Sequence, residues 1–356
     1  MFAIFLSFLT AFTLTYVATP HIITIARERN LCVEPDERSS HTISTPALGG
    51  IGIFSAAVFS IVMWTPFSEF ANLQYILCAF IIVFLMGVKD DFSPLNPVNK
   101  IFGQALAAGI LVFKSDVMLS GFYGIGYVHE IPFLPLPVWT GVTIFIMLVI
   151  INAFNLIDGI NGLAGSVGTL IAGTLGCWFF WAGRIELAVV SFSIVGAVLA
   201  FLKYNYTPAK IFMGDSGSLL LGTACAILII QFIDMNYAMD AADPRRVEGV
   251  PAVAVGIMII PLYDTMRVFT TRILRRQSPF SGDRRHIHHL LIDYGFSHMQ
   301  STGILVAVNT LFILFAFTLN AYLDVHLLLA LLLGMATLLS YLLHRGVIQR
   351  RQKKLA

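Results

Sequence analysis

Long apolar segments alternate with short polar connections along the whole chain. Segments of the length that crosses a bilayer, roughly 17–25 residues each, occur at eleven places. They cover residues 1–26, 47–66, 71–88, 98–114, 137–154, 163–182, 185–203, 216–234, 249–268, 301–321 and 324–344. The pattern predicts an all-α polytopic membrane protein with about 11 transmembrane helices. It also predicts a single membrane domain over residues 1–344, followed by a basic cytoplasmic tail at 345–356.

The composition supports a membrane protein. Of the 356 residues, 57% are hydrophobic and 12% are charged, and the mean hydropathy is +0.83, whereas soluble domains carry about 25% charged residues. A β-barrel is excluded because it would show short alternating strands instead of continuous apolar segments. The four cysteines form no Cys-x-x-Cys pair, so we interpret them as small core residues. Residues 1–19 lack a basic start and a cleavage site, and we expect a retained first span.

The basic residues predict the orientation. If the N-terminus lies outside, 18 of the 22 Lys and Arg residues fall on the cytoplasmic side, as the positive-inside rule requires. The C-terminus is then cytoplasmic, and so are five polar clusters. These clusters are residues 35–50, 89–100, 152–165, 203–218 and 267–298. A transporter would carry its ionisable residues near the midplane. Clusters at helix ends on one side favour an enzyme that works at the membrane surface.

The segment 151–165, INAFNLIDGINGLAG, has the most regular polar pattern in the chain. It contains Asn152, Asn155, Asp158 and Asn161. On a helix, positions 155, 158 and 161 would follow one another a turn apart and form one polar stripe. The three glycines of the segment allow turns or the close approach of a ligand. A polar loop between spans would explain a lone Asn-Gly pair, but this pattern is too regular for that.

Two aspartates end one of the predicted spans. Asp90 and Asp91 are adjacent, and keeping both ionised near a membrane requires a cation. Lys100 and Gln104 follow at the start of the next predicted helix, where a cation could meet a phosphate. A solvated helix end would explain the aspartates equally well, and positive-inside bias would explain the lysine.

Another aspartate precedes a later span. Asp215 lies in the Gly-flanked turn FMGDSGS, where the N–H groups of a helix start attract phosphate and a carboxylate can hold Mg²⁺. A helix N-cap is the simpler interpretation, and the two roles are compatible. Asn205 and Phe212, just upstream, could hydrogen-bond and stack a nucleobase. An aromatic residue at this depth is more often a membrane-interface anchor.

A basic cluster completes the set. The segment SPFSGDRRHIHHLL contains Arg284, Arg285, His286, His288 and His289. No cysteine or nearby carboxylate completes a zinc ligand set, so a phosphate-binding patch is the better interpretation. Contact with anionic lipid would explain the arginines but not the histidines. Together the clusters fit Mg²⁺-assisted phosphoryl transfer from a cytoplasmic nucleotide to a lipid-borne acceptor.

Five motifs in this order resemble the polyprenyl-phosphate N-acetylhexosamine-1-phosphate transferases of glycosyltransferase family 4. They are RSSHTISTPALGGIGI, VKDDF, NAFNLIDGINGLAG, KYNYTPAKIFMGDSGS and SPFSGDRRHIHHLL. The His-Ile-His-His form is similar to the branch that uses undecaprenyl phosphate and GlcNAc to start O-antigen, teichoic-acid and other surface glycans. The transferases for phospho-N-acetylmuramoyl-pentapeptide typically have three consecutive histidines. The family usually has an aspartate where this chain has Asn161, so no charged role is implied at that position.

The resemblance implies a UDP-N-acetylhexosamine donor, a polyprenyl phosphate acceptor, Mg²⁺ or Mn²⁺, and a multi-pass location in the bacterial inner membrane. It implies that Asp215 is the main metal ligand, with Asp91 or Asp90 completing the site, and that the catalytic residues are Asp90, Asp91 and Asp158. The implied substrate-binding residues are Lys100, Asn155, Asn161, Asn205, Phe212, Arg284, Arg285, His286, His288 and His289. The bilayer is an expected partner, nucleic acid is not, and a homodimer stays an option.

The implied reaction is attack by a lipid phosphate oxygen on the sugar-bearing phosphorus, with UMP leaving. A phosphate monoester has a second pKa of about 6, so the acceptor is largely ionised and needs a general base less than an alcohol would. Asp90 as a base stays open. The alternatives are the pentapeptide transferase of peptidoglycan synthesis and a transporter or flippase of phosphorylated lipids. Against the transporter, a site for an anion alone gains nothing from three aspartates unless a metal bridges them.

Overall fold

The computed structural model describes residues 1–32, 44–70, 72–127, 135–277 and 285–355. Within these ranges the chain forms thirteen α-helices and two short 3-10 helices, and each predicted apolar segment falls on helix. The α-helices are α1 (Phe2–Glu28), α2 (Gly49–Trp64), α3 (Leu73–Phe92), α4 (Pro97–Lys114), α5 (Leu136–Ile157), α6 (Leu163–Trp181), α7 (Ile185–Asn205), α8 (Gly214–Ala238), α9 (Val250–Ile257), α10 (Ile259–Leu274), α11 (Ile287–Tyr294), α12 (His298–Leu319) and α13 (Val325–Leu355). The predicted all-α polytopic membrane protein is confirmed.

Helix length gives fewer candidate membrane crossings than the hydropathy pattern. Eight of the described helices are long and apolar enough to cross a membrane, or nine if the bent pair α9–α10 is one span. Helix α2 has only 16 residues, and α4 does not qualify as a candidate span. The predicted eleven crossings therefore stay a prediction.

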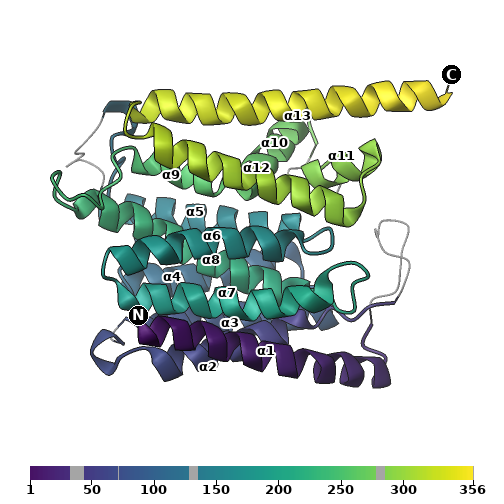
Figure 1. Ribbon diagram of the computed structural model, residues 1–356, viewed down its shortest axis with the longest axis horizontal. Helices are drawn as coiled ribbons and strands as arrows, with labels where there is room; N and C mark the ends of the chain where they lie inside the picture. Colours follow the sequence, from purple (N-terminus) through teal and green to yellow (C-terminus); the bar gives the residue numbers. More distant parts are fainter. Residues whose placement is uncertain (33–43, 71, 128–134, 278–284, 356) are drawn as a thin grey trace.

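Most of the long helices run side by side along one direction (Figure 1). Helices α1 and α2 form one edge of the bundle, and α13 forms the opposite edge. Helix α8 lies inside, packed by α2, α3, α5, α6, α7 and α9, and is buried along nearly its whole length. Its apolar residues cover all of its sides, which is the pattern of a helix surrounded by protein. The helix that begins with Asp215 is thus the centre of the fold.

The predicted span at 249–268 is a bent pair of helices, and whether the pair is one span stays a prediction. Helices α9 and α10 meet at Met258 with their axes bent by 83°. The bend frees backbone groups that need new partners in an apolar surrounding. Asn309 of α12 supplies them, because its amide nitrogen donates to the Ile257 carbonyl at 3.1 Å and its oxygen accepts from the Ile260 N–H at 3.3 Å.

Helices α2 and α3 both approach the start of α8 at backbone distance. A Cβ atom at Gly50 would lie 2.3 Å from the backbone nitrogen of Gly217. A Cβ atom at Gly87 would lie 2.4 Å from the Cα of Ser216. Only glycine fits such crossings of α2 and α3 with α8. The Gly50 N–H also donates to the Met213 carbonyl at 2.9 Å, which fixes the two helix starts together.

The basic residues that follow position 344 belong to a helix that stays in contact with the rest of the fold. Residues 345–355 continue α13 and reach α11, near the end of the bundle where the C-terminus lies (Figure 1). Arg351 forms an ion pair with Asp293 at 2.6 Å, and Arg350 donates to the Tyr294 carbonyl. The end of α13 therefore touches the helix that carries His288 and His289.

Candidate active site

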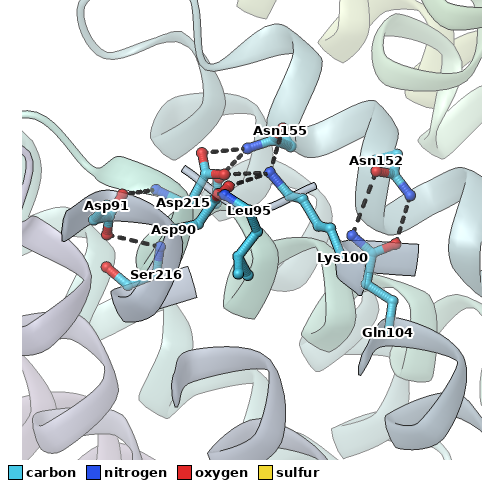
Figure 2. A network of polar contacts seen from close by, with 10 residues as sticks. Asp90, Asp91, Leu95, Lys100, Gln104, Asn152, Asn155, Asp215 and Ser216 are labelled. Carbon is cyan, nitrogen blue, oxygen red and sulfur yellow. Dashed lines mark hydrogen bonds and ion pairs between the residues drawn. The ribbon is translucent and has the colours of Figure 1, made fainter. Parts of the chain in front are cut away.

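Four of the predicted site residues, from four different helices, meet around one ammonium group. Lys100 of α4 lies 2.9 Å from Asp90 Oδ2 of α3 and also contacts Asp215 Oδ2 of α8. Its Nζ lies 3.4 Å from Asn155 Oδ1 of α5 (Figure 2). We call Asp90, Lys100, Asn155 and Asp215 the carboxylate–lysine centre. The sequence predicted a role for each of them, and the fold brings Lys100 and Asp215 together although they are 115 positions apart in the chain.

Asn155 orients the carboxylate of Asp215. Its amide nitrogen donates to Asp215 Oδ1 at 2.8 Å and contacts Ser218 Oγ at 3.0 Å. One turn earlier, Asn152 donates to Gln104 Oε1 at 2.7 Å, and Gln104 is fully buried (Figure 2). These amide pairs join α4, α5 and α8 and hold the centre in place. Asn152 and Asn155 both lie on the helical part of the segment 151–165.

Asp91 faces away from this centre, toward the start of α8. Its two oxygens accept the backbone N–H groups of Asp215 at 2.6 Å and of Ser216 at 3.1 Å (Figure 2). A carboxylate near a helix N-terminus is stabilised both by these hydrogen bonds and by the helix dipole. In this structure Asp91 binds these two N–H groups, and phosphate binding at this helix start stays a prediction. Asp90 and Asp91, although adjacent, have different partners.

The donor atoms of the centre suit a magnesium ion. Among the described residues, no three His, Cys, Asp or Glu side chains form a ready-made metal cage. Mg²⁺, however, usually binds through one or two carboxylates together with water and substrate phosphates. Oxygens of Asp90, Asp215 and Asn155 already converge on one cation, the ammonium of Lys100. These oxygens are the hard ligands that Mg²⁺ prefers, so the centre fits the metal that the sequence predicted.

The glycine-rich end of the segment 151–165 is a turn, so the predicted helical stripe stops at Ile157. Asp158 follows that helix end and is half-buried. Burial, together with the nearby carboxylates of Asp215 and Asp91, raises the pKa of Asp158 well above its usual range. Asn161 donates from its side chain to Thr207 Oγ1 at 2.9 Å, and its carbonyl accepts from Thr302 at 2.9 Å. Asp158 is thus close to the centre, whereas Asn161 binds the loop after α7 and helix α12.

Asn205 holds the backbone of the loops beside the site. Its oxygen accepts the Gly162 N–H at 2.7 Å, and its amide nitrogen donates to the Ile211 carbonyl at 2.9 Å. The side chain is buried, so its observed partners are protein atoms. Phe212 is half-buried, and its backbone pairs with Pro46 and Gly49 at 2.8 and 2.9 Å. Direct contact of either side chain with a nucleobase stays a prediction.

The basic segment, residues 285–289, lies where α11 begins; Arg284 lies outside the described residues. His288 is 1% exposed, and neither of its ring nitrogens has a hydrogen-bond partner among the residues that the structure describes. Burial and the neighbouring His289, whose ring lies 4.2 Å away, lower the pKa of His288 to about 3. His288 is therefore neutral at physiological pH and can bind a phosphate only as a hydrogen-bonding group. Its Nε2 would lie 2.4 Å from a Cβ atom at Gly159, so it packs against the turn after Asp158.

Sequence reasoning missed the residue that organises this segment. Asp264 of α10 is 1% exposed and lies 2.9 Å from His286 Nδ1. Its other oxygen accepts from Ile287 N and from Arg267 Nη2, each at 3.0 Å. The signal was available, because an acidic residue inside a predicted span is unusual and needs a partner.

Comparisons with known proteins agree with the geometry. The profile described as glycosyl transferase family 4 matches residues 73–233. The chain is 31% identical over 286 residues to an undecaprenyl-phosphate alpha-N-acetylglucosaminyl 1-phosphate transferase of Yersinia pestis, covering 78% of this chain and 73% of that protein. It is 30% identical to a decaprenyl-phosphate N-acetylglucosaminephosphotransferase of Mycobacterium tuberculosis (strain CDC 1551 / Oshkosh), covering 82% and 76%. The chain belongs to glycosyl transferase family 4.

A further relative extends the likeness over more of the chain. A probable undecaprenyl-phosphate N-acetylglucosaminyl 1-phosphate transferase of Bacillus subtilis (strain 168) is 28% identical over 324 residues, covering 90% of this chain and 86% of that protein. The family 4 profile includes all four residues of the carboxylate–lysine centre and ends before Asp264 and the basic segment. The resemblance inferred from the motifs is confirmed.

Proposed function

We propose that this family 4 member transfers N-acetylglucosamine 1-phosphate from UDP-N-acetylglucosamine to a polyprenyl phosphate and releases UMP. The observation that carries the proposal is the carboxylate–lysine centre at the ends of four helices, Asp90, Lys100, Asn155 and Asp215. The names of the relatives supply the sugar and the lipid class. The product would be a lipid-linked sugar that starts a cell-envelope glycan.

Within this proposal, Asp90 and Asp215 would hold a Mg²⁺ or Mn²⁺ ion. When bound, the metal would supply positive charge to the phosphoryl group as negative charge spreads over it. Asn155 fixes the orientation of the Asp215 carboxylate through its 2.8 Å hydrogen bond. Lys100 supplies a further positive charge beside the same oxygens. The protein thereby aligns the diphosphate before attack and stabilises the charge that develops.

The reaction is a displacement at phosphorus. An oxygen of the lipid phosphate forms a bond to the sugar-bearing phosphorus, the bond to the bridging oxygen breaks, and UMP leaves with that electron pair. Because the second pKa of a phosphate monoester is about 6, the attacking oxygen is ionised at neutral pH. Asp90 accepts the Leu95 N–H at 2.5 Å and pairs with Lys100, which suits a placed charge more than a proton acceptor.

We also propose the orientation in the bacterial inner membrane. The N-terminus lies outside, and the ends of α3, α5 and α10 face the cytoplasm, because that choice places 18 of 22 basic residues inside. Replacing the four native cysteines and introducing Ala242→Cys or Gln277→Cys gives two exposed reporters. An impermeant thiol reagent should label position 242 in intact cells and position 277 only after lysis. The opposite pattern would reverse the orientation.

The function is tested by UMP release from purified protein in detergent with undecaprenyl phosphate and UDP-N-acetylglucosamine. We expect release that requires the lipid phosphate and Mg²⁺ and stops with EDTA. UDP-N-acetylgalactosamine and UDP-N-acetylmuramoyl-pentapeptide, offered separately, report the donor. Release from the pentapeptide donor alone would assign the peptidoglycan reaction. Binding of lipid phosphate without UMP release from any donor would favour a transporter.

A further inference from the structure

Asp264 is a buried carboxylate that belongs to no predicted motif. It lies on α10, beyond the bend at Met258, and is 1% exposed. Three groups satisfy it: His286 Nδ1 at 2.9 Å, the Ile287 N–H at 3.0 Å and Arg267 Nη2 at 3.0 Å. An ionised carboxylate is costly to bury unless it is paired and hydrogen-bonded, and here both conditions are met.

These contacts fix the start of α11. No side chain of the flanking residue caps this helix, and the carboxylate of Asp264 takes that role by accepting the Ile287 N–H. The same Nη2 of Arg267 that donates to Asp264 also donates to the carbonyl of Arg285. Asp264 and Arg267, three positions apart on α10, thus hold the backbone at both Arg285 and Ile287.

The fixed start places the histidines. The His286 and His288 rings are nearly parallel, at 8°, with their centroids 5.7 Å apart. His288 in turn packs against Gly159, in the turn that follows Asp158. A shift of the Asp264 contacts would therefore move both histidines relative to the part of the site that α5 contributes.

The hydrogen bond to Asp264 also decides how His286 can act. Because Asp264 occupies Nδ1, Nε2 is the ring nitrogen left for another partner. A phosphate oxygen accepts hydrogen bonds, so it requires a proton on Nε2 while Nδ1 keeps its own. A carboxylate on one nitrogen and a phosphate on the other would together fix the orientation of the ring.

We propose that Asp264 is a positioning residue for the donor nucleotide. It holds His286 with Nδ1–H toward the carboxylate and Nε2–H toward a phosphate oxygen, and it keeps α11 against the turn at Gly159. This inference rests on the proposed function, because it takes the phosphate from the UDP-sugar. The groups that touch a phosphate would be the histidines; Asp264 acts through them.

The test uses the full chain in detergent and UMP as the probe. Asp264→Asn keeps the shape and an acceptor for the Ile287 N–H but removes the charge that pairs with His286. We expect UMP affinity, measured by calorimetry, to fall about tenfold, with the melting temperature close to that of the wild type. Asp243→Asn is the matched control, because Asp243 pairs with Arg245 in the connection between α8 and α9.

A double-mutant cycle separates positioning from a structural role. If Asp264 acts through His286, His286→Gln should lose as much affinity as Asp264→Asn, and the double variant should lose no more. Additive losses, or wild-type affinity in Asp264→Asn, would overturn the proposal. Should that variant not fold, ¹⁵N-histidine spectra of the wild type still decide, using His286→Gln for assignment. UMP must perturb the His286 ring signals, and an unchanged spectrum contradicts the inference.

Failure of the function looks different from failure of this inference. A wild-type protein that neither binds UMP nor releases it would remove the proposed function. A wild type that does both, beside an Asp264→Asn variant that is unaffected, would remove only the role of Asp264.

Discussion

In two regions of the molecule a helix start is capped in the same way, but the side chains around the two starts differ in charge. At the carboxylate–lysine centre, Asp91 of α3 accepts the N–H groups of Asp215 and Ser216 at the start of α8. At the basic segment, Asp264 of α10 accepts the N–H of Ile287 at the start of α11. In both, a carboxylate from a distant helix does what an adjacent N-cap residue usually does.

The surroundings separate the two regions. The start of α8 has further carboxylates beside it, Asp90 and Asp158, so it favours a cation. The start of α11 has Arg267, His286 and Arg285 beside it, so it favours an anion. The same capping arrangement therefore occurs at a region that favours a cation and at one that favours an anion. The residues around the cap decide which charge the region favours. A diphosphate with its metal would need both regions at once.

The largest effect is expected from Asp215→Asn. The variant keeps the shape of the side chain but removes the charge that a metal needs, so UMP release should fall on the order of a thousandfold. Asp234→Asn on the same helix is the matched control, because Asp234 binds Tyr123 and Ser120 far from the centre. Near-normal turnover by Asp215→Asn would remove it from the metal site.

The adjacent aspartates should respond differently to substitution. Asp91→Ala removes two acceptors from the start of α8, a change worth about 1 kcal/mol at a helix cap. We expect a lower melting temperature and a loss of activity that added Mg²⁺ does not recover. Asp90→Asn should lose activity with a normal melting temperature, and higher Mg²⁺ should recover part of it. If Asp91→Ala were recovered by Mg²⁺ and Asp90→Asn lowered the melting temperature, Asp91 would be the metal ligand and Asp90 the structural residue.

Gly159→Ala tests the contact between the two regions. The added Cβ atom would lie 2.4 Å from His288 Nε2, so the histidine or the turn must move. We expect roughly a tenfold fall in kcat/KM, the size of effect that a modest misplacement causes. Gly109→Ala on α4 is the control, because nothing lies within 4 Å of its Cβ position. Unchanged kinetics would show that α11 can shift without consequence.

The smallest effect concerns the pH dependence of stability at Asp158. Its raised pKa means that the folded state holds the proton more firmly than the unfolded state, whose pKa is about 3.9. Wild-type stability contributed by this group is therefore lost as pH rises above about 4 toward the folded pKa. Asp158→Asn removes that loss, so its melting temperature should exceed the wild type by a few degrees at pH 7 and depend less on pH. Parallel pH profiles of the two proteins would contradict this.

The sequence predicted the parts of the fold and of the site that depend on local pattern. Hydropathy located the helices, and clusters at helix ends identified Asp90, Lys100, Asn155 and Asp215 as members of one site. The partners of each polar atom depend on tertiary packing and were not predictable from spacing. Asp91 and Asn205 are examples, because both bind backbone groups of segments distant in the chain or across a loop.

Two features were missed although a signal existed. The bend at Met258 is flanked by Gly256 and Pro261, residues that weaken or interrupt a helix, but hydropathy alone treats 249–268 as one segment. Asp264 is a single acidic residue in a mostly apolar context, so it formed no motif. Its importance comes from His286 and Arg267, which become visible as partners only once α10 and the start of α11 are side by side.

The backbone crossings at Gly50 and Gly87 set a limit on how such a protein can diverge. The side chain of Asn161 binds Thr207 in a neighbouring loop, where an exchange of amide and carboxylate leaves the helices in place. At the two glycines even one methyl group would collide with the start of α8. Single substitutions can therefore change the loops around the site one at a time. The junction of α2, α3 and α8, in contrast, tolerates no side chain at either glycine.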